Sequence, residues 1–216
     1  MHPTSTASNP LFDRDFLLAT MMGPNCVRFA EELTANIPLS PNMRVLDLGC
    51  GMGLSSIYLA RTFGVRVFAV DLWINPSDNF ARFRDFGLED AIIPLRAEGH
   101  ALPFAEGYFD AVICIDAYHS FGCAPEYLDA HIVPLVKPGG FIAAAIPGLR
   151  QEFTGDIPDE LRPYWQEDIN FHSAGWWAEL WKQSARAAVR DAFSLRSHKA
   201  AWEDWLQCDN TYAQRD

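Results

Sequence analysis

The sequence predicts a three-layer αβα domain in which helices cover both faces of a mostly parallel sheet. Short apolar runs of strand length alternate with helix-sized amphipathic segments, a pattern typical of βαβ units. The runs themselves show little alternation of polar and apolar residues, as expected of strands that are buried on both sides. The length of 216 residues suits one domain, and the 49% of hydrophobic residues are enough to form its core.

The predicted strands are five runs rich in Val, Ile, Phe and Leu, at 44–48, 65–70, 91–95, 109–115 and 141–146. Helices are predicted between them, at 54–63, 79–86 and 125–136. Upstream, helical spacing of apolar residues predicts a helix over 24–37 and a shorter one over 11–20. After the fifth run we expect a helix over 173–185 with Ser173 as its N-cap, a sixth strand over 187–195 and a helix over 198–207.

The chain is expected to divide into an N-terminal segment, 1–22, and one domain, 23–216. The first segment is predicted to be a tail with a helix that acts as a lid. Residues 148–172 form an acidic insertion, because the connection is long, contains two prolines and carries more acids than bases. No apolar run approaches the ~20 residues of a membrane helix. The polar N-terminus also lacks the basic flank and apolar core of a secretory signal, so we predict a cytoplasmic protein.

The charge and the cysteine content limit which classes of partner and cofactor the chain can bind. The formal net charge is −11, and an acidic surface is unfavourable for nucleic acid and for anionic membranes. A small molecule, and a cationic one in particular, is easier to reconcile with this charge. The five cysteines are odd in number and show no C-x-x-C pair, which predicts reduced thiols and no metal site.

A glycine-rich turn after the first predicted strand is the strongest functional signal. It reads Asp47-Leu48-Gly49-Cys50-Gly51-Met52-Gly53. Glycines let the backbone turn sharply and approach a ligand, which the N–H groups at the start of the next helix then face. Asp71 ends the second predicted strand, where a carboxylate can accept hydrogen bonds from two ribose hydroxyls. The alternative is that Asp71 caps the helix that follows.

The ordered series of motifs, which also includes 97–104, 109–112 and 135–140, resembles that of class I S-adenosylmethionine-dependent methyltransferases. It is most similar to their small-molecule (methyltransferase type 11-like) group, over about 24–147. The resemblance implies a Rossmann-like methyltransferase fold and S-adenosylmethionine as cofactor. It implies that the amino-acid end of the cofactor is cradled by Asp47, Gly49, Cys50, Gly51 and Gly53. It further assigns the ribose to Asp71, the adenine to Leu72, Glu98 and Gly99, and the space beneath the methionine group to Ile115 and Asp116.

The same resemblance implies methyl transfer to a small molecule by in-line displacement, with oxygen, nitrogen or carbon as acceptor. His119 is the first candidate for a catalytic role because an imidazole takes a proton near neutral pH, and Tyr118 is the second. The alternatives for His119 are a pocket wall or a hydrogen bond that orients the substrate. Residues expected to line the substrate pocket are Met22, Asn25, His172 and Trp177. Ordinary helix starts (Asn25, His172) and core packing (Trp177) are the alternatives for three of them.

Two other functions stay open. One is a non-catalytic module that binds S-adenosylmethionine, which the burial of both Tyr118 and His119 would favour. The other is a nicotinamide-dependent oxidoreductase, although the G-x-G-x-G spacing differs from the dinucleotide fingerprint. The resemblance also implies a seventh strand beside the fifth, but no apolar run follows Leu206, so this strand is predicted to be missing. Because its slot would leave an exposed sheet edge, we predict a monomer or a homodimer.

Overall fold

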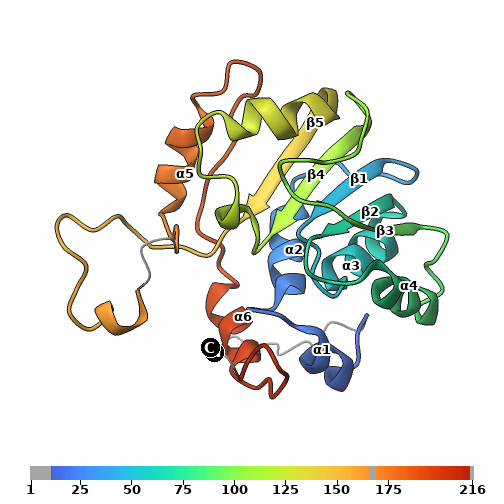
Figure 1. Cartoon of the computed structure of the whole chain (residues 1–216), viewed down its shortest axis with the longest axis horizontal. Helices are drawn as coiled ribbons and strands as arrows, with labels where there is room; N and C mark the ends of the chain where they lie inside the picture. Colours follow the sequence, from blue (N-terminus) through green and yellow to red (C-terminus); the bar gives the residue numbers. More distant parts are fainter. Residues whose placement is uncertain (1–10, 166–168, 215–216) are drawn as a thin grey trace, which may run out of the picture.

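The computed structural model describes residues 11–165 and 169–214, and its centre is a parallel sheet with the strand order β3-β2-β1-β4-β5 (Figure 1). The strands are β1 (Arg44–Leu48), β2 (Arg66–Asp71), β3 (Ile92–Arg96), β4 (Phe109–Ile115) and β5 (Val136–Ala145). Each predicted run overlaps one of them, and the predicted fold class is confirmed. The predicted tail at the start of the chain lies outside the described residues.

Helices flank the sheet and begin where the sequence supplies caps. They are α1 (Arg14–Thr20), α2 (Cys26–Thr34), α3 (Leu54–Phe63), α4 (Pro76–Asp85), α5 (Ala174–Trp181) and α6 (His198–Trp205). The side chains of Asp13, Asn25, Asn75 and Ser173 accept backbone N–H bonds and cap four of them. The helix predicted over 125–136 is irregular instead. A π-helical turn, Leu128–Ile132, leads into a 3-10 turn, Val133–Leu135, because Pro134 cannot donate to a regular helical ladder.

The side chains of each strand alternate between two apolar cores, one on each face of the sheet. Val45 and Ile113 lie in the core that packs against α2, α3 and α6. Leu46 and Val112 lie in the other, which packs against α5 and the turns after β4. At the amino ends of the strands, Asp110 binds the Lys137 ammonium and accepts the N–H of Arg44 at 2.8 Å, so two of the motif positions tie strands together there.

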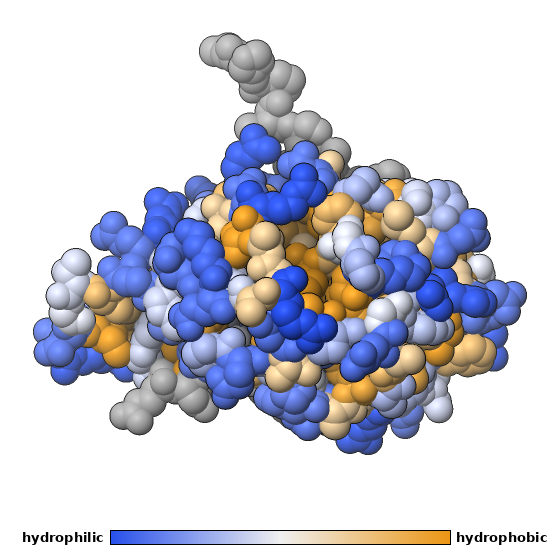
Figure 2. All heavy atoms as spheres, turned by 90° about the horizontal axis from the view of Figure 1, so that it is seen from above, coloured by the Kyte–Doolittle hydropathy of each residue, from blue (hydrophilic) through white to orange (hydrophobic). Residues whose placement is uncertain are grey.

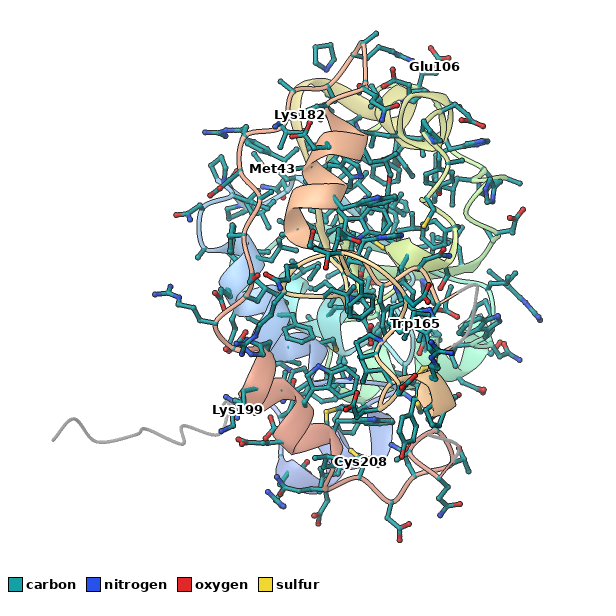
Figure 3. All side chains as sticks on the ribbon, turned by 90° about the vertical axis from the view of Figure 1, so that its left-hand side faces the viewer. Met43, Glu106, Trp165, Lys182, Lys199 and Cys208 are labelled. Atoms are coloured by element: carbon teal, nitrogen blue, oxygen red, sulfur yellow. The ribbon has the colours of Figure 1, made fainter. Side chains whose placement is uncertain are left out.

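The sixth strand predicted over 187–195 is not found, which is a correction. Within the described residues β5 pairs with β4 alone, so it forms the edge of the sheet. The segment between Lys182 and Lys199 runs along the outside of the molecule (Figure 3). The middle part of this segment and β5 line the same cavities, and Arg190 lies over the Phe141 ring of β5, but no hydrogen-bonded ladder joins the two among the described residues.

The surface carries two further features. The insertion that follows β5 leaves the sheet as a long loop that contains a 3-10 turn, Arg162–Tyr164 (Figure 1). Seen from above that view, the surface is hollowed, and apolar residues line the hollow (Figure 2). No helix among residues 11–165 and 169–214 has the length and apolar character needed to cross a membrane.

Candidate functional site

The glycine-rich turn joins β1 to α3 with three glycines in the left-handed region, at φ values of 76° for Gly49, 53° for Gly51 and 88° for Gly53. A side chain would collide at Gly49 and Gly53, and at Gly51 it would crowd the Met22 sulfur. A Cβ on Gly49 would lie 2.3 Å from the Ala117 Cβ, and one on Gly53 would lie 2.4 Å from the Phe83 ring. The turn is therefore a backbone cradle that admits only glycine at these positions.

Asp47 lies beneath this cradle, fully buried at the carboxyl end of β1. Its Oδ2 accepts hydrogen bonds from the Ser55 and Ser56 hydroxyls, each at 2.6 Å, whereas Oδ1 has no partner among the described residues. Burial raises the pKa of the Asp47 carboxyl to about 6, and the two serine hydroxyls oppose that rise. A buried, unpaired acceptor of this kind is poised to receive a donor, above all a cationic one.

Asp71, at the end of β2, contacts the cradle from the other side. Its Oδ2 accepts the Gly51 N–H at 2.8 Å, and its Oδ1 accepts those of Trp73 and Ile74 at 2.8 and 3.0 Å. The capping alternative is thus realised, and three of the roughly four lone-pair sites of a carboxylate are occupied. The assignment of the ribose to Asp71 stays a prediction, which requires some of these bonds to rearrange. Leu72, the predicted adenine contact, is exposed beside it.

The predicted adenine contacts on the third strand's loop lie in an aromatic setting. The Glu98 carboxylate is half-exposed and lies 2.7 Å from His100 Nδ1. The carbonyl of Gly99 accepts a hydrogen bond from the Tyr127 hydroxyl at 2.9 Å, and the rings of Tyr127, His100 and His131 contact one another. Because Glu98 already has this partner, its contact with adenine also stays a prediction.

The chain before α2 covers the cradle. Met22 Sδ would lie 3.0 Å from a Cβ on Gly51, and Asp116 Oδ2 would lie 2.4 Å from one on Gly23. Asp116 follows Ile115 at the end of β4 and has the unusual φ of 58°. The cradle, Ile115, Asp116 and the covering segment thus meet at the carboxyl edge of the sheet, the edge at which open α/β sheets bind ligands.

His119 and Tyr118 occupy different environments. His119 is partly exposed, its Nδ1 has no partner among the described residues, and burial lowers its pKa. Tyr118 is 1% exposed, and its ring packs against Trp177 and Trp181. Burial raises the pKa of Tyr118 far above its ordinary value, so its hydroxyl is unsuited to proton transfer near neutral pH. Of the two residues whose joint burial would favour a binding module, only Tyr118 is buried.

A cavity of about 310 Å³ begins at Asp116 and follows the edge of β5 between α2 and α5. His172 and Trp177 line it, as predicted for a substrate pocket. The His172 ring stacks on Trp176 with centroids 3.7 Å apart, and its Nδ1 lies 3.1 Å from Glu152 Oε2. The glycine-rich turn does not line this cavity, so Asp116 is the link between the two.

Of the other predicted pocket residues, Met22 lies over the glycine-rich turn. Asn25 does not line the cavity: its Oδ1 caps α2 at the Val27 N–H, 3.1 Å away, and its Nδ2 donates to Asp204 at 2.7 Å. Both polar ends of Asn25 are therefore engaged, which supports the alternative of an ordinary helix start.

Sequence reasoning missed three polar residues around the cradle. Ser55 and Ser56 directly follow the glycine motif, and their position at the start of α3 was a usable signal. Asn79 is buried on α4, and only the packing of that helix reveals its contact with the turn. Residues 11–165 and 169–214 contain no group of three or more His, Cys, Asp and Glu side chains placed to hold a metal ion.

Residues 46–144 match the profile of a methyltransferase domain family. This match, together with the relatives and solved structures that the chain resembles, supports a class I S-adenosylmethionine-dependent methyltransferase. A glycine/sarcosine/dimethylglycine N-methyltransferase from Actinopolyspora halophila is 29% identical over 139 residues, 62% of this chain and 24% of that protein. Methyltransferase GfsG from Streptomyces halstedii is 29% identical over 119 residues, 55% of this chain and 42% of that protein. The chain thus spans less than half the length of these relatives.

Solved structures share the fold. Geranyl diphosphate C-methyltransferase from Streptomyces coelicolor A3(2) superposes with a TM-score of 0.67 at 18% identity, covering 86% of this chain and 72% of that one. The [4+2]-cyclase SpnF superposes with a TM-score of 0.70 at 17% identity, covering 88% of this chain and 66% of that one. A methyltransferase fold thus also occurs in a protein named for another reaction, so the chemistry must be argued from the site.

The cofactor of this family is S-adenosylmethionine, and the site fits it. The cofactor carries an ammonium group that suits the buried, unpaired Asp47 Oδ1.

Proposed function

We propose that this methyltransferase domain transfers the methyl group of S-adenosylmethionine to a small-molecule acceptor. The observation that carries the proposal is the left-handed glycine cradle with the unpaired, buried Asp47 oxygen beneath it. A dinucleotide would bring no ammonium group to that oxygen. The nicotinamide alternative is therefore disfavoured by the site as well as by the family.

When bound, S-adenosylmethionine supplies a methyl carbon on a positively charged sulfur, which a nucleophile displaces in line. The residues of this chain bind the cofactor, orient the two reactants and exclude water. Asp47 would accept hydrogen bonds from the ammonium group, and Met22 and Gly23 would keep water from the cradle. His119 is neutral near pH 7 because burial lowers its pKa, so its imidazole can accept a proton from an acceptor that arrives protonated.

The acceptor would occupy the Asp116 end of the cavity, whose lining includes His172 and Trp177. Amines are the first class to test, because a carboxylate and an aromatic face favour a cation there and the whole chain is acidic. The names of two relatives support the choice: the N-methyltransferase from Actinopolyspora halophila acts on amino compounds, and another relative, from Triticum aestivum, is a phosphoethanolamine N-methyltransferase.

Two measurements test the proposal. Calorimetric titration with S-adenosylhomocysteine and, separately, NAD should give binding of the first alone. A screen of small amines, phenols and carboxylic acids with methyl-labelled cofactor should then give incorporation into an acceptor. Binding without incorporation in any class would favour the second candidate, a non-catalytic module.

A cytoplasmic location and a monomeric or homodimeric state belong to the same proposal. The five cysteines are all unpaired, which suits a reducing compartment. The open edge of β5 is the reason to test for a dimer, and sedimentation of the purified chain would decide the oligomeric state.

A further inference from the structure

Both peptide groups that flank Gly51, the central glycine of the cradle, are held by side chains. Asp71 Oδ2 accepts the Gly51 N–H at 2.8 Å, and Asn79 Nδ2 donates to the Gly51 carbonyl at 2.9 Å. Fixing both peptide planes fixes φ and ψ of the residue between them. These two bonds therefore hold Gly51 in its left-handed conformation, which costs even glycine the freedom of its other conformations.

Asn79 reaches the turn from α4, outside every motif of the sequence. It is 2% exposed, and its Nδ2 also lies 3.8 Å from Cys50 Sγ. Its Oδ1 accepts a hydrogen bond from Arg82 Nη1 at 2.7 Å, one helical turn further on. Because Arg82 only donates, it fixes which end of the amide faces the turn, and the donor end is the one that Gly51 needs.

We propose that Asn79 is a positioning residue for the cofactor site, with Arg82 setting the orientation of its amide. The inference rests on the proposed function, since it assigns Asn79 the task of holding the cradle in its binding shape before S-adenosylmethionine arrives. Without the amide, the carbonyl of the half-buried Gly51 keeps only the weak contact of the Cys50 thiol at 3.6 Å, and the turn is free to rotate away. Binding must then supply the order that Asn79 otherwise provides.

The test compares Asn79→Ala and Asn79→Asp with Asn75→Ala. Asn75 caps the same helix through the Ser77 N–H at 2.9 Å and does not contact the turn. We expect both Asn79 variants to bind S-adenosylhomocysteine about tenfold more weakly, the loss of one buried hydrogen bond, and Asn75→Ala to bind it as the wild type does. The aspartate has the volume of asparagine and still pairs with Arg82, so a role in packing alone would leave its affinity unchanged.

Hydrogen exchange of the backbone N–H groups over 49–53, measured without any ligand, gives a readout that does not depend on the proposed function. It should become faster in both Asn79 variants and stay unchanged in Asn75→Ala. If Asn79→Ala fails to fold, Arg82→Ala carries the same comparison, with an affinity loss of about threefold.

Wild-type affinity together with wild-type exchange in the Asn79 variants would overturn the inference and leave the proposed function standing. Failure of the wild type to bind S-adenosylhomocysteine would overturn the proposed function, and the exchange rates would still decide whether Asn79 holds the turn.

Discussion

Replacing Asp47 with asparagine tests two effects of its buried charge separately: the charge lowers the stability of the folded chain, and it strengthens binding of the cofactor. The side chain keeps its shape and can still accept from Ser55 and Ser56, but it loses the charge. Well below the ordinary pKa of 3.8, the wild-type carboxyl is protonated in both the folded and the unfolded chain. As the pH rises toward 6, the unfolded chain ionises first, because the folded pKa is raised to about 6. The free energy of unfolding must therefore fall over this interval.

The size of the effect follows from the two pKa values. The ordinary value is 3.8 and the folded value about 6, a difference worth about 3 kcal/mol at 1.36 kcal/mol for each pH unit. The free energy of unfolding of the wild type minus that of Asp47→Asn should fall by about this amount between about pH 3 and about pH 7. Taking the difference cancels every other carboxyl.

Urea unfolding of both proteins without cofactor, at half-unit pH steps, measures this difference. Titration with S-adenosylhomocysteine at pH 7.5 measures the other side, where the variant should bind about tenfold or more weakly because the ammonium group loses its charged partner. A difference that does not change with pH would refute the reasoning, because Asp47 would then titrate as an ordinary surface acid.

Three further substitutions test other parts of the site. Asp71→Ala should weaken S-adenosylhomocysteine binding by about 1–3 kcal/mol, measured by calorimetry, and unchanged affinity would remove Asp71 from the ribose. His119→Ala should lower turnover more than cofactor affinity in a methyl-incorporation assay, whereas equal losses would assign it to cofactor binding. Gly49→Ala should lower the free energy of unfolding by about 2 kcal/mol or more, because the new Cβ meets Ala117 in a left-handed backbone. A thermal midpoint equal to that of the wild type would contradict the tightness of the turn.

The sequence predicted the elements whose signals are local. The glycine spacing and the acids at the ends of β1 and β2 placed the cradle, because the order of strands and turns decides what meets at the carboxyl edge. Helix caps such as Ser173 were predictable because a cap depends only on residues that are neighbours in sequence.

Contacts between distant segments were not predictable. The partner of Asn25 is Asp204, at the far end of the chain, and the amide of Asn79 meets Gly51 only because α4 packs against the turn. The run over 187–195 has strand-like composition, but a strand also needs a neighbour to pair with. The sequence alone also could not show that the Asp71 carboxylate accepts three hydrogen bonds from backbone N–H groups.

Met22 and Gly23 cover the glycine-rich turn, where we expect the nucleoside of the cofactor to bind. We expect release of the product nucleoside to require movement of this segment, which would break the hydrogen bonds of Asn210 with the Leu18 and Met21 carbonyls. A bulky affinity tag fused upstream would load the same segment. Kinetic work is therefore best done with any tag cleaved away, because Asn210, near the other end of the chain, donates hydrogen bonds to the Leu18 and Met21 carbonyls directly before the same segment.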